Sequence, residues 1–209
     1  MCIVAKKRYA AMALAGLLLL AGGCGQSSEP EMRESVRFNE FIQGLYQPGE
    51  GQYKVLDQEM QDITEAFIEA TKEEAAKENY LAIRQYAREE DVTIQRWEVE
   101  PGQVTMDTYQ RVDLSAVEKR TGMSCCDVLY QWEVPYQWED GTLTAGNGRK
   151  THAGWDFFEN DKQFWFKAES RCPTEVEGGT LLAAPVNQVE VLNGGVIGQV
   201  ETVYRIPIG

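Results

Sequence analysis

The chain has 209 residues, with 20 lysines and arginines against 33 aspartates and glutamates, and a formal charge of −13 at pH 7. This acidity argues against a nucleic-acid-binding protein and against electrostatic docking on anionic lipid, because both depend on basic surfaces. After the N-terminal region, no segment offers the roughly 18 consecutive apolar residues that a membrane-spanning helix needs.

The first 25 residues have the layout of an export signal. Lys6, Lys7 and Arg8 form a basic region, and an apolar run of about 11 residues follows from Ala10 to Leu20. This run is too short to cross a bilayer as a helix, which takes roughly 20 residues. Small residues come next, as a cleavage site requires, and Cys24 follows them directly.

This segment resembles the leader of a bacterial lipoprotein, and Ala21-Gly22-Gly23-Cys24 resembles its lipobox, with Ala21 where Leu is most common. The resemblance implies cleavage before Cys24, a diacylglyceryl group on the Cys24 thiol and a further acyl chain, such as palmitate, on the new amino group. Gly25, in place of Asp, resembles the outer-membrane sorting signal of Gram-negative bacteria. The alternatives are an ordinary secretory signal with a chance cysteine, or an uncleaved anchor.

Cleavage at Cys24 would define three parts of the chain. Residues 1–23 would leave as the signal peptide, and the remaining 186 residues would carry a charge of −16, because three basic residues leave with it. Residues 24–34 are polar after the cysteine and have no apolar period, so we expect a lipidated flexible tether. Residues 35–209 have the length of a single domain.

Apolar spacing predicts helices early in this domain and strands later. Helical spacing favours a helix over 35–46 and a helical region over 55–90, either continuous or divided within the polar stretch 71–78. Alternation of period two then predicts a hairpin of strands around the turn at 100–103 and a third strand over 128–138. Further hairpins are expected around 159–162 and 193–195, with a loop over 172–179.

Helices followed by antiparallel strands predict the α+β class, with N-terminal helices packed on a curved antiparallel β-sheet. This order of elements is similar to the cystatin-like and nuclear-transport-factor-2-like folds. The resemblance implies a curved sheet that wraps a helix, an arrangement found in many bacterial lipoproteins.

The cysteines suggest one disulfide. Export implies an oxidising compartment, and lipidation of Cys24 leaves the thiols of Cys125, Cys126 and Cys172. Neighbours in a strand point to opposite faces, so only one of the adjacent pair can face Cys172. Strand parity favours Cys126–Cys172, with Cys125 as the alternative partner and a strained Cys125–Cys126 bond as a third arrangement. With no Cys-x-x-Cys motif and a single histidine, His152, we expect no metal and no cofactor.

Catalytic motifs are weak. His152 and Asp156 are four residues apart and could act as a general-base pair, although an isolated surface histidine is the favoured interpretation. Thr151 and Ser170 are potential nucleophiles, but no Gly-x-Ser-x-Gly motif surrounds a serine. The expectation is therefore a protein without catalytic residues.

Aromatic residues are dense between 130 and 166, and adjacent rings on strands cannot all face one core. Phe158 and Trp165 are the residues that we expect at an exposed binding surface. The alternative is that all these rings pack beneath the helices and the C-terminal hairpin.

Together these patterns predict a lipid-anchored bacterial envelope protein at the periplasmic face of the outer membrane. It would be a non-catalytic accessory, binding or structural protein, held to the membrane through Cys24 and contacting an envelope protein or the cell wall. The alternative is a ligand-binding or enzymatic module that uses a cleft at the mouth of the curved sheet.

Overall fold

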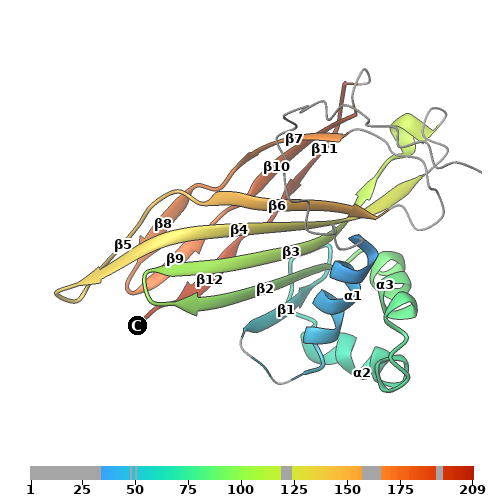
Figure 1. Cartoon of the computed structure of the whole chain (residues 1–209), viewed down its shortest axis with the longest axis horizontal. Coiled ribbons are helices and arrows are strands. Elements are labelled where there is room, and N and C mark those ends of the chain that lie inside the picture. The colour runs from blue at the N-terminus through green and yellow to red at the C-terminus, as the bar shows by residue number, and fades with distance from the viewer. Residues whose placement is uncertain (1–33, 48, 50, 119–123, 157–165, 192–194) are drawn as a thin grey trace, which may run out of the picture. The chain divides into compact units, whose positions relative to one another are not determined.

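The computed structural model describes residues 34–47, 49, 51–118, 124–156, 166–191 and 195–209 (Figure 1). These residues belong to one compact unit, Met32–Gly209. The leader, Cys24, Phe158 and Trp165 lie outside the described residues.

Three helices come early in the described chain: α1 (Glu34–Gly44), α2 (Thr64–Ala76) and α3 (Tyr80–Glu89). The predicted helix over 35–46 is confirmed by α1. Of the two alternatives for the second helical region, the structure has the divided one, because α2 and α3 are separated by a short turn in which Glu78 has a φ of 56°. Asn79 caps α3 by accepting a hydrogen bond from the backbone N–H of Ala82 (3.4 Å). None of these described helices is long and apolar enough to span a bilayer.

The expected start of the second helical region is wrong, because Gln52–Leu56 form strand β1. Val55 of β1 lies opposite Ile94, and both side chains are fully buried. Met60 has helical spacing from Leu56, but its φ is 61° and its side chain is exposed. Pairing and burial in a sheet therefore override the apolar spacing at this point.

The main sheet contains six strands, and all of its pairings are antiparallel. Its further members are β2 (Thr93–Glu100), β3 (Gln103–Asp113), β4 (Cys125–Glu139), β5 (Thr142–Ala145) and β6 (Arg149–Asp156). A short 3-10 turn, η1 (Ser115–Val117), follows β3. The predicted hairpin and third strand are confirmed by β2, β3 and β4. The second edge of β4 pairs first with β6 and then, over its last four residues, with β5.

Two three-stranded antiparallel sheets follow. Their strands are β7 (Phe166–Arg171), β8 (Thr174–Glu177), β9 (Thr180–Ala183), β10 (Val186–Val191), β11 (Gly195–Glu201) and β12 (Tyr204–Pro207). One sheet has the order β11-β10-β7 and the other β12-β9-β8. The expected hairpin at the C-terminal end is confirmed by the pairing of β10 with β11.

The hairpin expected around 159–162 stays a prediction, because residues 157–165 lie outside the described ranges; in the described part, β6 bonds to β4 and β7 bonds to β10. One expectation for this region is wrong. The segment 172–179 is not a loop throughout, because β8 and β9 form a hairpin around Gly178-Gly179. These two strands have only four residues each, so their alternation is too short to stand out in the sequence.

The main sheet carries an apolar core on each face. One core joins the helices to Val55, Ile94, Tyr109 and Leu129, which lie opposite one another on β1, β2, β3 and β4. The other core joins the opposite face to the strands β9 and β12. Figure 1 shows the three helices grouped together near β1, with β5 at the far end of the sheet. The described residues thus form an α+β arrangement that is mainly antiparallel β-structure.

Candidate functional site

A cavity of about 380 Å³ lies between α1 and the helix-facing side of the main sheet. We call it the α1 pocket. From the helix, Arg37, Glu40, Phe41 and Gly44 line it. These residues have the spacing i, i+3, i+4 and i+7, which places them on one face of a helix. The α1 helix thus presents a mixed polar and apolar face to the pocket.

The sheet side of the pocket is a row of polar residues. Tyr53, Arg96, Asp107 and Gln131 lie opposite one another on four adjacent strands, and all four line the pocket. Each is two residues from the apolar row of Val55, Ile94, Tyr109 and Leu129, so both rows share a face. The helices pack on the apolar row, and the neighbouring polar row forms the pocket floor.

An ion-pair network fixes this floor. Arg96 donates from Nη1 to Asp107 Oδ2 (3.0 Å) and from Nη2 to Glu98 Oε2 (2.8 Å). One guanidinium therefore serves two carboxylates, which leaves a net negative charge on the three side chains. Burial raises the pKa of the Asp107 carboxyl, and the Arg96 guanidinium opposes this rise.

Two buried polar atoms of the pocket residues lack hydrogen bonds within the described part of the chain. Asp107 is only 3% exposed, and its Oδ1 has no partner at hydrogen-bond geometry, although the nearby Gln131 also lowers its pKa. On the helix side, Arg37 Nε is buried without an acceptor. Both atoms have almost no accessible surface, and an unmade hydrogen bond to a buried group costs about 1–3 kcal/mol of folding free energy.

Two aromatic rings form the β1 end of the pocket. The Phe41 and Tyr53 rings have centroids 5.8 Å apart at an interplanar angle of 55°. The Tyr53 hydroxyl lies so close to α1 that a Cβ at Gly44 would overlap it. Gly44 therefore permits the ring to lie against the helix.

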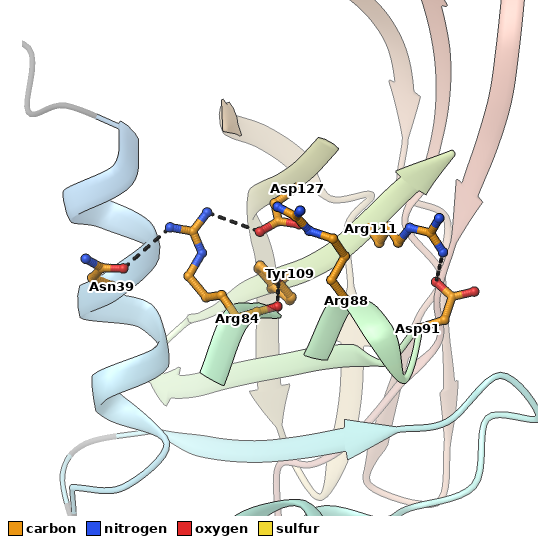
Figure 2. A network of polar contacts seen from close by, with 7 residues as sticks. All are labelled: Asn39, Arg84, Arg88, Asp91, Tyr109, Arg111 and Asp127. Atoms are coloured by element: carbon orange, nitrogen blue, oxygen red, sulfur yellow. Dashed lines mark hydrogen bonds and ion pairs between the residues drawn. The ribbon is translucent and has the colours of Figure 1, made fainter. Parts of the chain in front are cut away.

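A second polar network lies outside the pocket and ties α1 and α3 to the sheet (Figure 2). Asp127 on β4 accepts from Arg84 Nη2 (3.1 Å) and Arg88 Nε (3.3 Å) of α3. Arg84 also reaches Asn39 Oδ1 of α1 (3.4 Å), and its Cζ lies 4.6 Å from the Phe38 ring centroid. Arg84 and Asp127 have side chains 1% and 0% exposed. Through Asn39, this network helps to position α1, which forms the helix side of the pocket.

The expected disulfide is not formed, and Cys125, Cys126 and Cys172 are present as thiols. Cys172 forms an isolated β-bridge with Gly148, and a Cβ at Gly148 would also contact Val134 on β4. Cys126 is eight residues before Val134 on the same strand, which corresponds to about 26 Å at roughly 3.3 Å per residue. Cys126 and Cys172 lie in one core, as strand parity predicts. Parity does not give the separation of the two residues along the strands, and that separation prevents the bond.

The other predicted site residues do not gather into a catalytic arrangement in the described chain. His152 is half-buried on β6, where it lies opposite Gln131. The backbone of Asp156 ends the same strand. Ser170 Oγ accepts from Lys150 Nζ (2.7 Å) and donates to Asn187 Oδ1 (2.6 Å), contacts that link β6, β7 and β10. No three described His, Cys, Asp or Glu residues are placed to hold a metal ion.

The aromatic cluster lies mostly in a core, as far as it is described. Tyr130 and Trp132 are buried, and Trp155 packs edge-on against Tyr130 with centroids 6.1 Å apart. Trp138 is exposed. The expected binding surface at Phe158 and Trp165 stays a prediction, because both residues lie outside the described ranges.

The pocket residues were not predicted, although the sequence holds one signal for them. In a hairpin that turns at Pro101-Gly102, Arg96 and Asp107 fall directly opposite each other, and both share parity with buried apolar residues. Opposite charges at paired, inward-facing positions indicate a buried polar site. The contribution of α1 has no such signal, because it depends on how the helix crosses the sheet.

No family model, curated protein or solved structure matches the chain. The α1 pocket is therefore interpreted from its own geometry.

Proposed function

We propose that this chain is a lipid-anchored envelope protein whose domain binds a small polar ligand in the α1 pocket, without catalysing a reaction. The observation that carries the ligand-binding role is the row of four polar side chains on the floor of the cavity, with Arg96 and Asp107 at its centre. A cavity with a few convergent polar groups beside aromatic and aliphatic side chains is typical of a small-molecule site.

The anchoring role rests on the leader. A basic region, a short apolar run, small residues and Cys24 support lipidation and attachment at the periplasmic face of the outer membrane. The order of helices and strands supports a curved-sheet domain similar to the cystatin-like and nuclear-transport-factor-2-like folds. A pocket between the first helix and the sheet favours a ligand-binding role over a purely structural one.

Two measurements test the proposal separately. Cys24→Ser should shift the native protein from the membrane fraction to soluble or precursor forms, and unchanged fractionation would count against the anchor. For ligand binding, a thermal-shift panel of sugars, amino acids, nucleosides, polyamines and short peptides should contain at least one compound class that raises the melting temperature. A ligand at about 100 times its Kd adds roughly 2.7 kcal/mol of stability. A panel without any stabilising compound would contradict the binding role.

A further inference from the structure

The size of the α1 pocket limits what it can hold. Its volume of about 380 Å³ is at the small end of the range of roughly 300–1,000 Å³ for small-molecule sites. A polymer strand or a folded partner segment exceeds this space, so the occupant is a single small molecule. The groups that line the pocket then decide the chemistry of this molecule.

The charged residues of the lining compensate one another. Two are basic and two are acidic, so their formal charges cancel: Arg37, Glu40, Arg96 and Asp107. On the floor, Arg96 already binds Asp107 (3.0 Å) and Glu98 (2.8 Å). On the helix wall, Arg37 and Glu40 are neighbours at positions i and i+3. A charged ligand therefore meets no unbalanced counter-charge in the lining, and moving its charge out of water is costly.

Uncharged hydrogen-bonding groups are accessible in the same pocket. Gln131 on the floor and Gln47 after α1 both line it, and neither residue is buried. A primary amide offers both donors and an acceptor, as a hydroxyl group does. Gln131 is also a hydrogen-bond neighbour of Asp107, and an amide with one N–H directed there still offers a second N–H and its oxygen. A molecule with several hydroxyl groups can pair with both amides without bringing a charge.

The aromatic residues of the pocket do not offer a face on which a nucleobase could stack. The Phe41 ring is only 7% exposed, because it stacks on Tyr109 with centroids 6.3 Å apart and also contacts the Tyr53 ring. Flat bases are bound largely through open aromatic faces. Phe41 instead forms an apolar wall together with Leu129, which suits the carbon-bound hydrogens of a small saturated ring.

We propose that the ligand of the α1 pocket is a neutral monosaccharide, whose hydroxyl groups bind Gln131 and Gln47 and whose ring lies against the apolar wall. This rests on the proposed function of the pocket as a ligand site. An amino acid, a polyamine or an organic acid would bring a charge for which the lining has no free counter-charge.

The test is calorimetry of the full-length protein with D-glucose, D-galactose, D-mannose and the N-acetylated 2-amino derivative of each. At least one of these neutral sugars should bind saturably. The tightest binder is then compared with the free 2-amino sugar and the uronic acid of the same configuration, below the pKa of the amino group. Both charged sugars should bind at least tenfold more weakly. This comparison uses the wild-type protein and so does not depend on how a variant folds.

Variants then place the sugar in the pocket. Gln131→Leu should weaken the tightest neutral sugar at least tenfold, because leucine is similar in size but forms no hydrogen bond. Gln47→Ala removes the second amide at an exposed position after α1 and should weaken the sugar at least threefold. Gln137→Leu is the matched control, because Gln137 is an exposed residue of the same strand as Gln131 and lies outside the lining. It should change the affinity less than twofold.

The outcomes separate the two proposals. Binding of amino acids, polyamines or nucleosides that is weakened by Gln131→Leu, with no binding of neutral sugars, would overturn the monosaccharide and leave the pocket as a ligand site. Charged and neutral sugars that bind equally well would also overturn it, as would sugar binding that neither Gln131→Leu nor Gln47→Ala weakens. The absence of binding by every compound class would overturn both.

Discussion

Asp127→Asn should be the most destabilising of the conservative substitutions in the polar network of Figure 2. The change keeps the shape of the side chain but removes the carboxylate that bridges Arg84 and Arg88. Arg84 is 1% exposed and cannot turn to water, whereas Arg88 is 22% exposed and can. Breaking a buried ion pair by removing one partner costs about 3–5 kcal/mol, and burial, which raises the pKa of the Asp127 carboxyl in spite of the two arginines, offsets part of this cost.

That loss is a large part of the roughly 5–15 kcal/mol by which a domain is stable. For a domain of this size it corresponds to a fall of roughly 6–20 °C in melting temperature. Urea unfolding followed by tryptophan fluorescence would measure it, with an unchanged m-value as evidence that the denatured state is the same.

A control and a repair sharpen the test. Glu133→Gln breaks the exposed pair with Arg149 and should cost no more than about 1 kcal/mol. Arg84→Met combined with Asp127→Leu should recover most of the stability, because a buried ion pair can be replaced by apolar packing. If Asp127→Asn costs no more than Glu133→Gln, then the buried network does not hold the helices on the sheet.

Three further results are expected. Peptide mapping without reductant should find no bond between Cys126 and Cys172, and recovery of that cross-linked peptide would contradict the strand register. Gly148→Ala should cost about 1–3 kcal/mol in urea unfolding, because its Cβ would lie 2.7 Å from the Cys172 sulfur; Gly49→Ala, with its nearest neighbour 3.9 Å away, should stay within about 0.5 kcal/mol of wild type. Burial raises the folded-state pKa of Asp107 above its unfolded value, so its ionised form destabilises the fold, and this cost disappears as the pH falls through the folded pKa. The stability of wild type relative to Asp107→Asn should therefore increase between pH 7 and pH 4, and a decrease would show that the ion pair with Arg96 outweighs burial.

The helices and strands that were predicted correctly are those with a long, regular spacing of apolar residues. The stripe from Phe38 to Leu45 identified α1, and the alternation through Tyr130 and Trp132 identified β4. The prediction was wrong at β1, where Leu56 and Met60 have helical spacing by chance. The positive φ of Met60 is incompatible with a helix through this residue. The strand conformation of this segment is determined by its pairing with β2, whose residues are about 40 positions away in the sequence.

The candidate site was harder to predict because three layers of information must combine. Strand register places Arg96 opposite Asp107, and sheet parity turns both toward the helices. The angle at which α1 crosses the sheet then decides whether these two side chains are covered or face a cavity. Apolar spacing along α1 does not give that angle. The cysteines show the same limit, since parity gave the correct face but not the distance along it.

The environment of Cys172 has a consequence for the proposed export of the chain. Burial raises the pKa of its thiol to about 11, so roughly one molecule in ten thousand carries the reactive anion at neutral pH. Mixed-disulfide formation with a thiol oxidoreductase requires that anion and an open path to the sulfur. Cys172 is 2% exposed, so once the chain has folded, its sulfur is protected from oxidants without needing a partner.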